Sequence, residues 1–404
     1  MAGPLQGFRV LDLSRILAGP WASQMLADLG AEVIKVERPG SGDDTRSWGP
    51  PYMPGADGEP STEAAYYSSA NRGKQSVCID IAQPRGQELV RELARDCDVF
   101  IENFKLGGLR RYGLDYNSLQ AINAKLVYCS ITGFGQDGPY AERAGYDFMI
   151  QAMGGLMSIT GAADGEPQKV GVAVADLLTG LYAVNAIQAA LMHQVKTGQG
   201  QYIDMALLDV QVAALANQAT NFFASGHNPR RYGNAHPNIV PYQAFQTRDG
   251  YIILAVGNDG QFRRFCELAG RSELADDERY ASNSARVRNR DSLLPQVVEV
   301  MRTRGSDEWL QQLNSRGIPC GPINNIDQVF DDPQVRHRGL RLELDHPTAG
   351  RVAGVANPIR FSGTPIEYER AAPTLGQHTD EVLQRLLGLD EEAIARLHED
   401  AVIA

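Results

Sequence analysis

Short apolar runs alternate with longer amphipathic segments through the N-terminal part of the chain. The apolar runs predict strands over 8–13, 32–37, 99–102 and 126–131. The segments between them predict helices, the clearest over 19–29 and 84–95, each with proline in its first turn. Strands and helices in alternation are typical of an α/β fold with a mostly parallel, doubly wound sheet.

The pattern changes after a long apolar helical run over 177–196. A strand over 201–206 and a helix over 207–225 follow, and then a segment rich in glycine, proline and asparagine. Beyond it we expect a hairpin around Asp249-Gly250, helices over 260–270 and 291–314, a second Pro/Gly-rich passage, and a last helical stretch over 380–397. The predicted organisation is a large domain (1–225), a small α+β domain with linkers (226–330) and a C-terminal segment that returns to the large domain (331–404).

Composition narrows the possible partners. The 404 residues are 43% hydrophobic and 22% charged, enough for two or more cores, and the formal net charge of −11 argues against nucleic acid. No run of 18 apolar residues or basic-then-apolar leader is seen, so we expect no membrane partner and a cytoplasmic location. Five scattered cysteines without a C-x-x-C pair argue against a disulfide framework and a structural metal site. The first strand-to-helix turn, SRILAGP, lacks G-x-G-x-x-G, so a dinucleotide cofactor is not indicated.

Asp176 is the most informative single residue. It lies in GVAVADLLTGLYA, where a segment of small residues passes into the apolar helical run. By position alone, an N-cap aspartate is the simpler interpretation. The alternative is a carboxylate aimed at an electrophile, as a covalent nucleophile requires.

Several longer segments resemble the family III CoA-transferases, a family that includes formyl-CoA transferase and the carnitine CoA-transferases. They are LDLSRILAGPWASQMLADLGAEVIKVERPGSGDDTR, ENFKLGGLRRYGLDY, the Asp176 segment, TGQGQYIDMALLD and LGQHTDEVL, in that order. The spacing of GNAHPNIVPYQAF, GYIILAVGNDGQF and GIPCGPINN most resembles the branch that uses succinyl-CoA and dicarboxylates such as glutarate. The resemblance implies a Rossmann-like large domain, a smaller domain, and an interlocked homodimer.

The resemblance also implies a mechanism without a metal or any cofactor beyond CoA as substrate. Asp176 would attack the thioester of an acyl-CoA, pass through a mixed anhydride to an aspartyl-CoA thioester, and transfer CoA to a free carboxylic acid. Gly257 and Gly260 match the family's glycine-rich loop, which closes over the intermediate. A plain strand-to-helix turn that needs glycine for a positive φ is the alternative for these glycines.

Candidate CoA contacts follow from the same match. Among the cations, Arg38 and Arg111 are the best-supported candidates for binding CoA, and Arg72 is added from local charge alone. Tyr146 and Asp147 match family positions near the nucleophile. The alternative for these two residues is a core tyrosine and a helix-capping aspartate. The remaining family positions that contact CoA match Leu17, Ala18, Lys74, Asn103 and Phe104.

A dicarboxylate acceptor needs a cation for its second carboxylate. The candidates for this cation are Arg15, Arg46 and His236. Trp48 matches an aromatic position near the family's active site, and the alternative for Trp48 is packing in the interior. Formyl-CoA:oxalate-type or carnitine-type transfer stays an alternative for the substrate. A racemase of the same fold would need a His-Asp pair at 146–147, where this chain has Tyr146-Asp147. A CoA-binding protein without catalysis would not need Asp176.

Overall fold

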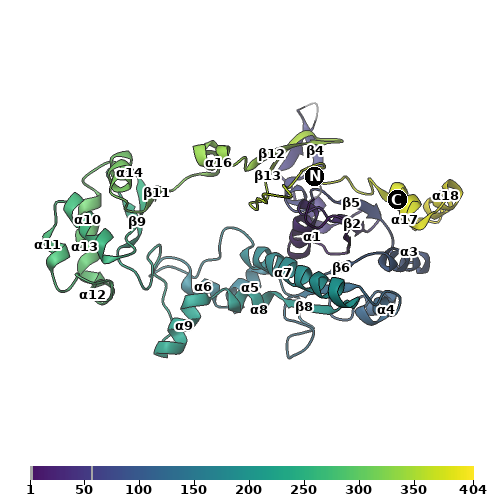
Figure 1. Ribbon diagram of the computed structural model, residues 1–404, viewed down its shortest axis with the longest axis horizontal. Coiled ribbons are helices and arrows are strands. Elements are labelled where there is room, and N and C mark those ends of the chain that lie inside the picture. The colour runs from purple at the N-terminus through teal and green to yellow at the C-terminus, as the bar shows by residue number, and fades with distance from the viewer. Residues whose placement is uncertain (1–2, 56–57) are drawn as a thin grey trace. The chain divides into compact units, whose positions relative to one another are not determined.

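The chain folds into two units that alternate along the sequence. The computed structural model describes residues 3–55 and 58–404 (Figure 1). Unit 1 takes the chain up to Gly155, together with Gly171–Ala216 and Pro333–Ala404, and unit 2 contains Leu156–Val170 and Asn217–Asp332. The sequence-based boundaries at 225 and 330 therefore differ from the structure, which assigns 156–170 and 217–225 to unit 2.

A six-stranded parallel sheet forms the centre of unit 1. From β1 the chain moves outward through β2 to β5, and it then crosses to β6 on the other side of β1 and continues to β8. The direction of this progression reverses between β1 and β6, and parallel sheets bind ligands beyond the carboxyl ends of their strands at such a point. The spatial order is β5 (Gln75–Cys78), β2 (Glu32–Glu37), β1 (Arg9–Asp12), β6 (Val99–Glu102), β7 (Val127–Thr132) and β8 (Tyr202–Ala206).

Neighbouring residues in these strands belong to opposite cores. Val10 packs in a core with helices α1 (Ala18–Asp28) and α7 (Val174–Thr197), whereas Leu11 packs in a core with α3 (Pro84–Arg95) and the C-terminal helices. The strands are apolar throughout because both faces of the sheet are covered. Each large aliphatic side chain buried in this way contributes roughly 1.5–3 kcal/mol.

The C-terminal stretch docks on this sheet, as its apolar pattern suggested. It forms two helices, α17 (Thr379–Leu387) and α18 (Glu391–Glu399), separated at Gly388, whose φ of 67° ends the first of them. Val382 and Ile394 enter the core that contains Leu11.

Helix α7 is long and apolar enough to cross a membrane by length and composition alone. In the structure one face of it is buried against the sheet and against α1. The two helices approach closely at Gly180, where an added Cβ would lie 2.8 Å from the carbonyl oxygen of Ala18.

Shorter elements complete unit 1. A prediction of one helix over 207–225 is wrong, because the chain turns at 214–215 and a second helix begins at Ala216, whose φ is 45°. The remaining elements are η1 (Asp44–Ser47), β3 (Tyr52–Pro54), β4 (Pro60–Ala64), α2 (Ala65–Ser68), η2 (Arg110–Tyr112), α4 (Tyr116–Gln120), α5 (Asp147–Met153), α8 (Leu207–Ala213), α16 (Pro333–His337), β12 (Arg341–His346) and β13 (Gly350–Val355).

Unit 2 packs helices against a three-stranded antiparallel sheet in the order β11-β10-β9. Trp309 and Tyr280 are the largest aromatic side chains of its core, followed by Phe245, Phe262 and Phe265. The predicted helix over 291–314 is two helices, because the chain turns at 302–305. The elements are α6 (Leu156–Ile159), α9 (Ala216–Ser225), β9 (Tyr242–Gln246), β10 (Tyr251–Ala255), α10 (Asp259–Leu268), α11 (Glu273–Asp276), α12 (Asn283–Arg288), α13 (Arg290–Met301), α14 (Ser306–Ser315), β11 (Cys320–Pro322) and α15 (Ile326–Asp331).

Candidate active site

The loops that follow β1 and β6 are joined at the carboxyl edge of the sheet. The backbone N–H of Arg15 donates to Oδ1 of Asn103 at 2.9 Å, and Nδ2 of Asn103 donates to the carbonyl of Arg15 at 2.7 Å. The guanidinium of Arg15 lies over the ring of Phe104, 5.5 Å from its centroid. Two strands that are distant in sequence therefore present their first loop residues together, at the point where the strand order reverses.

A cavity of about 180 Å³, called here the small cavity, opens beside these loops. The structure brings seven of the predicted site residues to its wall: Arg15, Leu17, Ala18, Asn103, Phe104, Tyr146 and Asp176.

Asp176 lies in the first turn of α7 but does not cap it. The carboxylate of Asp147 takes that role, because its Oδ1 accepts the N–H of Ala175 at 2.8 Å and that of Asp176 at 3.4 Å. The N-cap interpretation of Asp176 is therefore wrong. Burial, and next the charge of Asp147, raise the pKa of Asp176 to about 7.

Tyr146 and Asp147 lie at the start of α5, as its N-cap residue and its first residue. Tyr146 is 65% exposed and lines the small cavity, so the alternative of a core tyrosine is wrong. Asp147 begins α5, and Nε2 of Gln151 donates to its second oxygen at 2.7 Å. The alternative of a helix-capping aspartate is correct for Asp147, although the helix that it caps is α7. Its contact with CoA stays a prediction.

Sequence reasoning missed Tyr66 in α2. Burial raises the pKa of Tyr66, and the next largest causes are the charges of Asp176 and Asp147. Trp48 packs edge-on against Tyr66 with ring centroids 5.1 Å apart, and it is 43% exposed. The buried-packing alternative for Trp48 is therefore wrong. Helix α2 has only four residues, which is too short for a hydrophobic periodicity to be seen in the sequence, so no pattern pointed to Tyr66.

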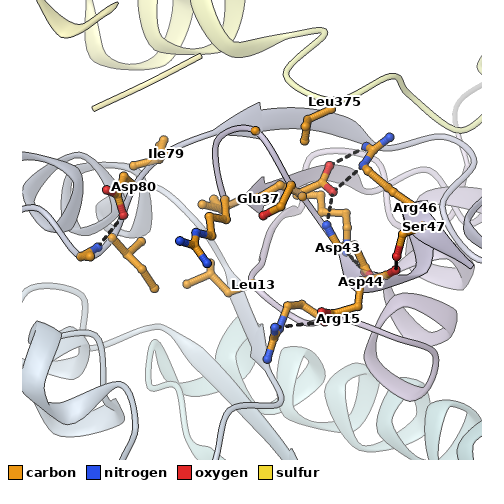
Figure 2. A pocket seen from close by; sticks show the side chains of 18 of the residues that line it. Leu13, Arg15, Glu37, Asp43, Asp44, Arg46, Ser47, Ile79, Asp80 and Leu375 are labelled. Carbon is orange, nitrogen blue, oxygen red and sulfur yellow. Dashed lines mark hydrogen bonds and ion pairs between the residues drawn. The ribbon is translucent and has the colours of Figure 1, made fainter. Parts of the chain in front are cut away.

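A second cavity of about 930 Å³, called here the large cavity, lies at the same edge of the sheet (Figure 2). Arg15 and Phe104 line both cavities. Arg38, directly after β2, is exposed at its wall and forms no ion pair with any residue of the described chain. Arg111 stacks on Tyr112, 4.5 Å from the ring centroid, and Tyr112 also lines this cavity. Both arginines are available to an anionic ligand.

Another predicted cation, Lys74, is already engaged in the interior. Nζ of Lys74 is fully buried and donates to Asp12, Asn71 and the carbonyl of Pro20 at 2.8–3.2 Å. Burial lowers the pKa of Lys74 to about 7 despite the attraction of Asp12. All three donors of a lysine are thus used within the protein. This geometry favours a structural role for Lys74 over a CoA contact.

Arg46 and Arg72 are likewise paired. Arg46 binds both carboxylate oxygens of Glu37 at 2.9 and 2.7 Å, as Figure 2 shows. Arg72 binds both oxygens of Asp28, the last residue of α1, at 2.8 and 2.6 Å. Because α1 runs away from the carboxyl end of β1, this pair lies toward the opposite edge of the sheet. The structure does not bring Arg72 to either of the two cavities.

The β1 loop itself is strained. Ile16 has a φ of 73°, a value that β-branched residues rarely adopt. Its N–H donates to Asp43 at 3.2 Å, and Asp43 is paired in the interior with Lys35 at 2.9 Å. Nζ of Lys35 also donates to the carbonyl of Ser14 at 2.8 Å. The Lys35–Asp43 pair therefore holds the backbone on both sides of Arg15.

The remaining predicted residues belong to unit 2. The N–H of Gly257 donates to the side chain of Gln261 at 2.7 Å, and Gly260 lies in the first turn of α10. Neither glycine has a positive φ, so the turn-strain alternative is wrong for both. Nδ1 of His236 accepts the N–H of Asn238 at 3.0 Å, and burial, followed by Arg290, lowers its pKa.

Comparison with known proteins identifies the class to which this fold and site belong. A model of CoA-transferase family III matches residues 5–379, and the chain belongs to that family. Succinate–glutarate CoA-transferase of Agrobacterium fabrum is 55% identical, with 96% of this chain and 97% of the relative covered. Human succinyl-CoA:glutarate CoA-transferase is 46% identical, with 99% and 90% covered. A CAIB/BAIF family protein from Brucella suis has a crystal structure with a TM-score of 0.84 at 54% identity, covering 96% of this chain and all of that one.

The resemblance inferred from the sequence motifs is therefore confirmed, and the chain is a CoA-transferase.

Proposed function

We propose that this enzyme transfers CoA from succinyl-CoA to glutarate through a covalent intermediate on Asp176. The observation that carries the proposal is the position of Asp176 in the wall of the small cavity, at the carboxyl edge of a parallel sheet. The choice of substrates draws support from two relatives whose names specify succinate or succinyl-CoA and glutarate. The large cavity, with Arg38 at its wall, is the proposed seat of the CoA nucleotide.

The proposed reaction begins when a carboxylate oxygen of Asp176 attacks the thioester carbon of succinyl-CoA. The C–S bond breaks, and CoA thiolate leaves a mixed anhydride. The thiolate then attacks the aspartyl carbonyl, which releases succinate and leaves an aspartyl-CoA thioester. Glutarate attacks that thioester, thiolate leaves again, and its attack on the glutaryl carbonyl gives glutaryl-CoA and restores Asp176. One thioester is exchanged for another through a positioned nucleophile, so no external energy source is needed.

The residues around Asp176 argue against racemisation. Among the described residues that line the small cavity there is no histidine, and the residue next to Asp147 is Tyr146. A His-Asp pair for proton abstraction is therefore not assembled in the described wall of this cavity.

The proposal includes a Rossmann-like large domain, an interlocked homodimer, a cytoplasmic location and no metal requirement. Support for the dimer comes from exposed apolar side chains on α5 and α7, among them Phe148, Met153, Met192 and Val195. A dimer that persists at nanomolar concentration in size-exclusion chromatography is expected, and dialysis against a chelator should leave the activity unchanged.

Trapping the intermediate tests the proposed function. The enzyme is incubated with succinyl-CoA and hydroxylamine, and the modified peptide is mapped by mass spectrometry. A hydroxamate at Asp176 is expected, with formation of glutaryl-CoA when glutarate replaces hydroxylamine. Modification at another residue would refute the assignment of the nucleophile, and no CoA ester from a panel of glutarate, malate, itaconate, oxalate, formate and carnitine would refute the transfer.

A further inference from the structure

The three cations predicted for the distal carboxylate of the acid are separated by the structure. Arg46 is bound by both oxygens of the interior carboxylate Glu37. His236 lies in unit 2, where its Nδ1 is occupied by a backbone N–H. Arg15 alone of the three lines the small cavity together with Asp176.

The position of Arg15 is fixed before any ligand arrives. Asn103 binds its backbone on both sides, and the ring of Phe104 lies beneath its guanidinium. The strained backbone of the next residue, Ile16, is held by the interior carboxylate of Asp43. A cation held in this way needs little reorganisation to bind an anion.

The guanidinium of Arg15 nevertheless has a weakly held partner. Nη1 lies 3.0 Å from Oδ2 of Asp44, and the two side chains are 48% and 52% exposed (Figure 2). Ion pairs this exposed are screened by water and contribute little. A carboxylate that arrives in the small cavity can therefore take the place of Asp44.

We propose that Arg15 selects dicarboxylate acids by binding their distal carboxylate, and that Asp44 is the displaceable counter-ion that occupies Arg15 between turnovers. The inference rests on the proposed function, because the proximal carboxylate is taken to react at Asp176. A monocarboxylate leaves Arg15 paired with Asp44 and gains no charge-assisted hydrogen bond, whereas a dicarboxylate exchanges one carboxylate for another. The volume of about 180 Å³ suits a small acid.

Arg143 is the competing candidate, because it also lines the small cavity. Its guanidinium lies over Tyr140, 4.4 Å from the ring centroid, and it has no ion pair within the described chain. Arg143 is exposed in the segment between β7 and α5, and no side chain equivalent to Asn103 fixes its backbone in the hydrogen bonds of the described residues. Arg143→Gln is therefore the matched control for Arg15→Gln.

The test compares glutarate with pentanoate, which has the same chain length but lacks the second carboxylate. In a double-displacement reaction kcat/KM for the acid is independent of the donor, so succinyl-CoA can be used throughout. Arg15→Gln should lower kcat/KM for glutarate at least about tenfold and change that for pentanoate less than about threefold. Arg15→Lys should retain part of the preference. Asp44→Asn should raise kcat/KM for glutarate about two- to fivefold, and Arg143→Gln should keep the wild-type ratio.

Equal losses for both acids in Arg15→Gln, or a lost preference in Arg143→Gln, would overturn the inference. A decrease for glutarate in Asp44→Asn would do the same. Hydroxylamine trapping with succinyl-CoA is run on the wild type in parallel: if Asp176 is labelled and Arg15→Gln keeps its preference, only this inference fails. If Asp176 is not labelled, the proposed function fails first.

Discussion

Asp147 caps the helix that carries Asp176, and the same carboxylate raises the pKa of its neighbour. One acid thus fixes the backbone of α7 at its first turn and, second to burial, raises the pKa of the other acid to about 7. The candidate nucleophile is kept more basic than an ordinary aspartate, and a more basic carboxylate is a better nucleophile when it is ionised.

We predict that kcat/KM for succinyl-CoA rises with pH through about 7, because only ionised Asp176 attacks and kcat/KM reports the free enzyme. Asp147→Asn should move this midpoint to lower pH, since the repelling charge is removed while the amide oxygen can still accept the N–H of Ala175. The midpoint should stay above the ordinary range for aspartate because burial, the larger cause, persists. An unchanged midpoint would show that Asp147 does not influence the reacting carboxyl group.

Replacing the nucleophile should make the protein more stable at alkaline pH. Because the pKa of Asp176 is about 7 when folded and near 3.9 when unfolded, the folded state binds more protons between these values, and stability falls as pH rises through that window. Asp176→Asn should remove this loss and raise the free energy of unfolding at pH 8 by about 1–4 kcal/mol. Urea denaturation at pH 8 and at pH 4 provides the comparison, with a smaller difference expected at pH 4.

At position 16 we predict that glycine gives a more stable protein than alanine, the reverse of their usual order. Alanine is normally the more stable of the two by about 0.5–1 kcal/mol, because glycine loses more conformational entropy on folding. At a φ of 73° the Cβ of alanine is strained, so Ile16→Gly should be more stable than Ile16→Ala by about 1 kcal/mol. The urea denaturation midpoints of the two variants measure this difference in stability. A more stable Ile16→Ala variant would mean that the loop adopts another conformation in solution.

Substitution of Lys74 tests whether this residue, predicted from the sequence to contact CoA, instead has a structural role. Lys74→Met leaves Asp12 with one fewer buried partner and should cost about 3–5 kcal/mol of stability, with Asp12→Asn in the same chain restoring part of it. Chemical denaturation measures both variants. Unchanged stability together with a raised KM for succinyl-CoA would instead support direct contact with CoA.

Arg38 and Arg72 form a matched pair of arginine substitutions, one at an exposed and one at a paired, largely buried side chain. Arg38→Ala should raise KM for succinyl-CoA several-fold, and the effect should shrink at high salt, because an unpaired arginine at the large cavity would bind phosphate. Arg72→Ala should leave that KM unchanged and lower stability by about 1–3 kcal/mol, since it removes a bidentate partner of the nearly buried Asp28. Steady-state kinetics at two ionic strengths, with denaturation of each variant, separates these outcomes.

The α/β alternation, the family and the candidate nucleophile could all be predicted from the amino-acid sequence. The strands around Val10, Val33 and Val99 are apolar because both of their faces are covered, and that pattern is local enough to see in the chain. Helix breaks were missed where a single residue decides them, as at Ala216, since a positive φ at a residue other than glycine leaves no compositional signal.

Which charged side chains are free to bind a ligand could not be predicted and became visible in the folded chain. In the sequence, Arg38, Arg72 and Lys74 are candidate ligands of CoA and Arg46 is a candidate ligand of the acid. Three of these four are held by carboxylates that lie 9 to 62 residues away along the chain. The pKa of Asp176 was likewise raised by its burial and by Asp147, 29 residues earlier in the chain. Pairing and burial depend on which segments meet in space, and a side chain's availability to a ligand is a property of those neighbours rather than of its own position in the chain.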